Sequence, residues 1–119
     1  MARGFRLNGM VATAQGPVRL YGRAGKREES VSGQMWLQQQ GVPEFFTGAA
    51  TEYSQAGDTF SSAFEGVYGT DGLHGRPARL TLTVTDDPDT AVFTLLVENQ
   101  VVLVETEPLP LIGGYVTPV

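Results

Sequence analysis

Residues 79–98 read RLTLTVTDDPDTAVFTLLVE, and this stretch decides the fold class. From Leu80 to Thr85, apolar and threonine side chains alternate, which is the period-two pattern of a strand with one buried face. The tetrapeptide Asp-Asp-Pro-Asp at 86–89 predicts a turn, and a second apolar run follows it from residue 91. Two such runs joined by a short turn predict an antiparallel hairpin.

Similar runs occupy the rest of the chain. Gly, Pro, Asn and Asp residues separate them, and no stretch has the spacing of an amphipathic helix. We therefore expect an all-β fold, a small antiparallel barrel or sandwich of about eight strands. The expected strands lie near residues 4–14, 18–24, 31–39, 44–53, 60–68, 80–85, 91–98 and 101–107.

The length of 119 residues predicts one domain. We expect residues 1–107 to form it, and residues 108–119, which are uncharged and contain three prolines, to be an extended arm rather than a strand within the sheet. No apolar run approaches the ~18 residues of a membrane-spanning helix, and none of signal-peptide length follows the amino terminus. The sequence thus predicts a soluble protein with no membrane partner, and it leaves the compartment open between the cytoplasm and elsewhere.

Charge is segregated along the chain. The first 27 residues contain six basic side chains and no acid, whereas residues 51–119 contain ten acids against Arg76 and Arg79. In a closed barrel the last strand lies beside the first, so glutamates of the last hairpin would neutralise Arg6 and its neighbours. In an open sandwich the unlike charges would favour head-to-tail association between copies. We expect that hairpin to turn around Asn99-Gln100, with core residues Phe93, Leu95, Val97, Val102 and Val104 and, on the opposite face, Glu98, Glu105 and Glu107.

Catalytic groups are scarce. The chain has one histidine and no cysteine, so we expect no enzyme, no metal and no cofactor. His74 lies in a glycine-rich loop, where Asp71 is within reach, and we interpret it as a solvated loop residue. The turn 86–89 lacks the spaced acids of a calcium loop. A carboxylate-dependent hydrolase is our third interpretation, because three acids are embedded in central strands near aromatic residues: Glu44, Glu52 and Glu65.

The strongest constellation lies on the first three strands. If the six-residue loop 25–30 closes a regular hairpin, Arg19 lies opposite Trp36 and Tyr21 opposite Gln34. The tryptophan then falls on a polar, outward face, where an exposed cation–π contact with Arg19 contributes only ~0.5–1 kcal/mol. Something further must cover the indole. The candidate binding residues on this face are Arg6, Arg19, Tyr21, Arg23, Gln34, Trp36 and Gln38.

Three covers are open: another part of the same chain, a protein, or a nucleic acid or sugar. Because Trp, Tyr and Arg are enriched at the centres of interfaces, we expect a non-catalytic protein-interaction or self-assembly (structural) module. Its expected partner is another protein or a second copy of the same chain. The alternative is a ligand-binding barrel or sandwich for a single-stranded nucleic acid, a glycan or a small apolar molecule. A net charge of −5 and a pI near 4.7 rank nucleic acid below protein.

Overall fold

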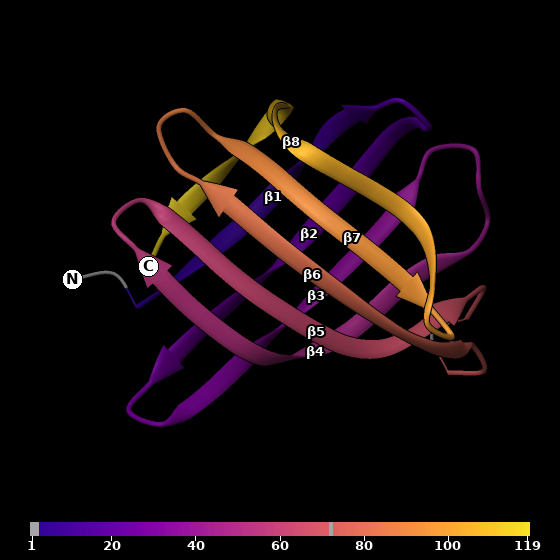
Figure 1. Cartoon of the computed structure of the whole chain (residues 1–119), viewed down its shortest axis with the longest axis horizontal. Helices are drawn as coiled ribbons and strands as arrows, with labels where there is room; N and C mark the ends of the chain where they lie inside the picture. The colour runs from indigo at the N-terminus through magenta and orange to yellow at the C-terminus, as the bar shows by residue number, and fades with distance from the viewer. Residues whose placement is uncertain (1–2, 72) are drawn as a thin grey trace.

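The computed structural model describes residues 3–71 and 73–119 and contains, within them, eight antiparallel strands that follow one another around a closed barrel (Figure 1). The predicted all-β class is confirmed, and the architecture is the barrel rather than the sandwich. In these ranges there is no helix long and apolar enough to cross a membrane. The strands are β1 (Gly4–Thr13), β2 (Gly16–Arg27), β3 (Ser30–Gln39), β4 (Phe45–Ala56), β5 (Thr59–Gly69), β6 (Arg76–Thr85), β7 (Thr90–Val97) and β8 (Gln100–Pro118).

Apolar side chains fill the barrel interior. Leu80, Leu82 and Val84 of β6 point inward, as their alternation predicts, while the intervening threonines face outward. Among the largest fully buried side chains are five phenylalanines, and the Phe5 and Phe60 rings lie 5.6 Å apart between centroids. A small eight-stranded barrel is just wide enough for side chains to fill it, so its interior is a packed core.

Tight turns set the register of the hairpins. β2 and β3 pair as far as Arg27 with Ser30, so only Glu28 and Glu29 form the turn, and Glu28 has a left-handed backbone with φ of 58°. The β7–β8 turn is Glu98-Asn99, where both residues have positive φ. Two-residue turns with left-handed residues match the twist of paired strands. The six-residue loop predicted at 25–30 is therefore wrong.

The last strand differs most from its prediction. Residues 108–118 are not an arm outside the sheet, because they belong to β8 and pair with β1 from Phe5–Pro118 to Val11–Leu111. The register shifts at Gly113 and Gly114, where φ is 66° and 94°. A Cβ at residue 114 would collide with the carbonyl of Asn8, so this bulge requires glycine. The prolines lie where ladder hydrogen bonds are interrupted or end.

A second bulge changes which β8 residues enter the core. The β7–β8 register shifts between Leu95 and Leu96, which places Leu103 opposite Leu95 in the interior. Val104, a predicted core residue, is instead 38% exposed, while Val102 is partly buried against the core. A bulge inserts one residue and reverses the facing of those beyond it, and strict alternation from the turn does not reveal it.

Candidate functional site

A groove of about 670 Å³ lies on the outer face of the barrel wall formed by β1, β2 and β3, with one residue each from β4 and β8. We call it the Trp36 groove. Side chains of two kinds meet in it, aromatic and cationic, around a floor that includes Leu7, Gly22 and Met35. Its outward-facing members are Arg6, Asn8, Tyr21, Arg23, Gln34, Trp36, Thr47 and Tyr115.

The groove is built from two parallel rows of cross-strand neighbours. One row runs Tyr115, Asn8, Tyr21, Trp36 and Thr47, each directly opposite the next across five strands. Directly opposed side chains in antiparallel strands share one face, so strand parity alone points all five outward. Aromatic surface is therefore concentrated along one line across the barrel wall.

The second row lies two residues along the strands, ~6–7 Å away. It contains Arg6, Arg23 and Gln34, which oppose one another across β1, β2 and β3, and all three are exposed. Two like charges directly opposite each other repel and destabilise the pair. Arg6 and Arg23 thus form a cationic pair that an anion would stabilise.

Trp36 is partly covered by its own chain. The Phe45 ring lies 6.1 Å from the indole between centroids, tilted by 37°. The two tyrosines of the row are open, since Tyr21 is 59% exposed and Tyr115 is 46% exposed. The indole therefore packs against Phe45 on one side and neighbours the exposed Tyr21, while Tyr115 lies farther along the same row, an arrangement suited to contact with a flat or apolar surface.

The register corrects the predicted partners without changing the face. Tyr21, not Arg19, lies opposite Trp36, and Arg23 lies opposite Gln34, because the β2–β3 turn is four residues shorter than the predicted loop. The predicted Arg19–Trp36 cation–π pair is wrong. In the part of the chain that the structure describes, the one such pair is Arg76 over Tyr68, at 6.0 Å.

Five of the seven predicted binding residues line the groove. Arg19 and Gln38 do not line it, since they oppose each other farther along β2 and β3. The Gln38 amide instead donates to the Val42 carbonyl at 2.9 Å and stabilises the loop that leads to β4. Tyr115 was missed because its segment was predicted to be an arm. The alternation Tyr115-Val116-Thr117 is the signal that could have placed it in the sheet.

Basic charge on this wall has no counterpart in the fold. Six of the eight cations lie on β1, β2 or the residue before β1, all of them exposed, and within the described ranges none takes part in an ion pair. The expectation that the last strand neutralises the first is wrong. The half of β8 that pairs with β1 is the uncharged half, whereas Glu105 and Glu107 lie in the half beside β7.

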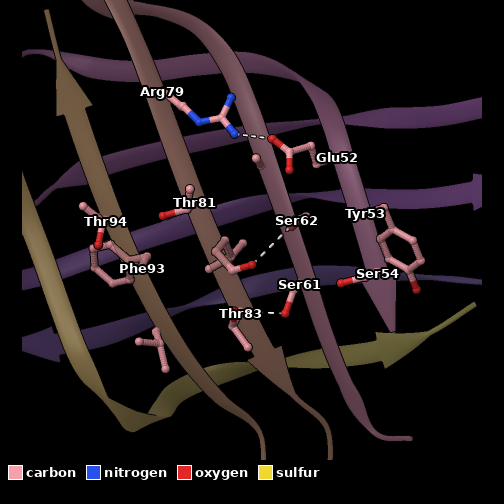
Figure 2. A pocket seen from close by; sticks show the side chains of 13 residues that line it. Glu52, Tyr53, Ser54, Ser61, Ser62, Arg79, Thr81, Thr83, Phe93 and Thr94 are labelled. Carbon is pink, nitrogen blue, oxygen red and sulfur yellow. Dashed lines mark hydrogen bonds and ion pairs between the residues drawn. The ribbon is translucent and has the colours of Figure 1, made fainter. Parts of the chain in front are cut away.

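A second groove, of about 340 Å³, lies across β4 to β7 (Figure 2). Arg79 there contacts both Glu52 and Glu65, the latter at 3.4 Å between Nη1 and Oε2. Glu44, the third candidate acid, lies elsewhere, near Tyr68, whose pKa is raised by burial and then by Glu44. A glycosidase pair flanks a substrate cleft, whereas these two carboxylates share one guanidinium on an exposed wall lined by Ser and Thr hydroxyls.

His74 meets Asp71 as the sequence allowed, with 2.9 Å between Nδ1 and Oδ2, in an exposed loop. The Asp71 carboxylate also accepts the backbone N–H groups of His74 and Leu73, and these bonds lower its pKa to about 2. This is an aspartate-centred turn, which orders the loop. Across residues 3–71 and 73–119, no three His or acidic side chains are placed to hold a metal ion.

Comparisons with protein-family models, with curated proteins and with solved structures each find no match for this chain.

Proposed function

We propose that this protein is a non-catalytic interaction module that binds a protein partner through the Trp36 groove. The observation that supports it is the convergence of Trp36, Tyr21 and Tyr115 with Arg6 and Arg23 in a single groove. Tyr, Trp and Arg dominate the energetics of protein interfaces, because the aromatic rings bury large areas at a low cost in conformational entropy and the guanidinium forms strong charge-assisted hydrogen bonds.

The scaffold supports the proposal in two ways. The groove residues lie on paired strands rather than on loops, so their positions are fixed before a partner arrives. The barrel interior is filled by apolar side chains, which directs binding to the outer wall. A partner that covers Trp36 and the two tyrosines supplies the shielding that Phe45 supplies only in part.

Sedimentation or light scattering over a concentration series tests this function. The wild type is expected to associate, and Trp36→Ala to weaken association by ~30-fold or more, as interface-centre residues do. Val101→Ala is the matched control, because this side chain is 59% exposed but lies outside the groove. A wild type that stays monomeric and behaves identically after the Trp36 substitution removes the support for this function.

A second candidate function has its own observation. An aromatic row beside a cationic row suits a single-stranded nucleic acid, whose bases stack on rings while its phosphates meet arginine. Trp36 is the only tryptophan, so its fluorescence reports on the groove alone. Quenching by short oligonucleotides at physiological salt would favour this candidate, and an unchanged spectrum across oligonucleotides and glycans would leave the protein partner.

A further inference from the structure

Four aspartates gather at one end of the barrel, on two neighbouring turns. Asp58 lies in the β4–β5 turn, and the other three lie in the β6–β7 turn, Asp86, Asp87 and Asp89. The Asp86 N–H donates to the Asp58 carbonyl at 3.0 Å, which holds the two turns together (Figure 1). We call these four residues the Asp end.

The Asp end is short of positive charge. No ion pair involves any of the four aspartates in the described part of the chain. Burial raises the pKa of Asp86, and so do its contact with Asp89 and the charges of Asp89, Asp58 and Asp87. Asp89 is already engaged, since its Oδ2 accepts the Val116 N–H at 3.0 Å. The charges most open to a partner are therefore those of the exposed Asp58 and Asp87, while Asp86 is half-buried beside Asp89.

The Trp36 groove carries the opposite, positive charge. Arg6 and Arg23 oppose each other directly with no acid beside them, and Arg3, Lys26 and Arg27 extend the positive surface along the same strands as far as the Glu28-Glu29 turn. Each of the two surfaces repels itself in the free protein, and each would be relieved by the other. Within residues 3–71 and 73–119 no ion pair joins the two patches, although their charges are complementary.

The Asp end and the groove are built from different elements. The Asp end consists of two hairpin turns at one end of the barrel, where three of the aspartates line a hollow together with Leu111 and Gly114, whereas the groove lies in the side wall (Figure 1). The β6–β7 turn contacts β8 at Val116, next to the groove residue Tyr115, so the two surfaces lie near each other on the barrel. Contact between unlike surfaces of two copies is heterologous, and it leaves a free groove and a free Asp end for further copies.

We propose that the Asp end of one copy docks into the Trp36 groove of the next, with aspartates between Arg6 and Arg23, so that the chain assembles head to tail. This inference rests on the proposed function and names a second copy as its partner. Charge-assisted pairs between carboxylate and guanidinium set the register, and the aromatic row covers the apolar surface around them.

Charge-reversal variants of each surface test the pairing. Arg6→Glu/Arg23→Glu reverses the charge of the groove and keeps the Asp end, while Asp58→Lys/Asp86→Lys reverses charge at the Asp end and keeps the groove. Each variant alone is expected to associate at least ~30-fold more weakly than wild type in sedimentation equilibrium. Mixed together, the two are expected to regain association, because the intact Asp end of one meets the intact groove of the other and the two reversed surfaces also carry opposite charges.

Controls separate this pairing from general electrostatics and from misfolding. Glu98→Lys/Glu107→Lys makes the same change in net charge at other acids and is expected to retain assembly. Asp58→Asn/Asp86→Asn removes the charges without reversal and keeps side-chain size, and it is expected to weaken assembly by ~10-fold. Thermal unfolding checks that every variant is folded.

Three results overturn the inference. If wild type associates and Trp36→Ala disrupts it, but the aspartate variants assemble normally, the groove binds protein and the Asp end is not its partner. If the mixture of reversal variants does not associate, or the Glu98/Glu107 control weakens assembly equally, head-to-tail docking is wrong. A monomeric wild type that ignores Trp36→Ala contradicts the proposed function itself.

Discussion

Asp89 links the β6–β7 turn to β8, and the loss of its side chain should lower stability measurably. Its Oδ2 accepts the Val116 N–H at 3.0 Å, and its backbone carbonyl accepts the Leu111 N–H, also at 3.0 Å. Asp89→Ala removes the first, partly buried bond and leaves the amide of the buried Val116 without that partner. A hydrogen bond to a charged acceptor contributes ~1.5–3 kcal/mol, and partial exposure reduces this to about 1–2 kcal/mol.

That loss corresponds to a fall in melting temperature of roughly 3–8 °C for a domain of this size. The bond to Val116 is the main cause that lowers the pKa of Asp89 below its ordinary value of 3.8. A lowered folded-state pKa means stability that is present above the unfolded-state value and is lost as pH falls through the folded-state value. The difference between wild type and Asp89→Ala is therefore expected to shrink below pH ~4.

Chemical denaturation across a pH series is the assay. Asp58→Asn is the control, because it also removes one carboxylate, and the Asp58 side chain makes no hydrogen bond within residues 3–71 and 73–119. An equal loss of stability in Asp58→Asn would refute the role assigned to this bond. So would a difference in unfolding free energy between wild type and Asp89→Ala that is the same at about pH 3 and about pH 7, which lie ~4 units apart across the carboxyl range.

Three further outcomes are expected. Phe64→Ala, at a fully buried core ring, should lower the free energy of unfolding by ~3–5 kcal/mol in urea titrations, and a loss below ~1 kcal/mol would contradict the packed interior. Gly114→Ala should destabilise by more than ~1 kcal/mol and accelerate amide exchange along the β1–β8 ladder, since a Cβ there meets the Asn8 carbonyl. Arg79→Met should change stability by less than ~1 kcal/mol, because the Glu52 and Glu65 carboxylates that it contacts are largely exposed; a larger loss would show that this cluster stabilises the barrel.

Local patterns predicted the strands well, and the physical reason is that one buried face imposes a period of two. Leu80, Leu82 and Val84 enter the core as expected, and Trp36 lies on the outer wall with Tyr21 and Arg23. The face to which each strand residue points is still predicted correctly when the loop length is wrong by an even number of residues. The predicted residues therefore share one outward face and five of them line the Trp36 groove, although every predicted partner across β2 and β3 was displaced by two.

Alternation along a strand does not predict bulges or the closure of the barrel. The direction in which side chains point beyond a bulge depends on the local backbone and on the opposite strand, so Leu103 is buried and Val104 exposed, the reverse of the prediction. Tyr115 joined the groove only because β8 leaves β7 after Pro110 and pairs with β1 from Leu111 onward. Proline content suggested an arm, but the need to satisfy the edges of β1 and β7 outweighed it.

The charge distribution also has one part that the sequence determines and one part that the fold determines. The chain's composition and order alone separated basic and acidic residues into two halves, since that is a property of position along the chain. Whether those halves neutralise each other depended on which segment of β8 reaches β1, and the barrel brings the uncharged residues 111–118 there. Alternation along a strand follows from local geometry, whereas the identity of distant neighbours follows from how the whole sheet closes. The unmatched Arg6–Arg23 pair and Asp end are consequences of that closure.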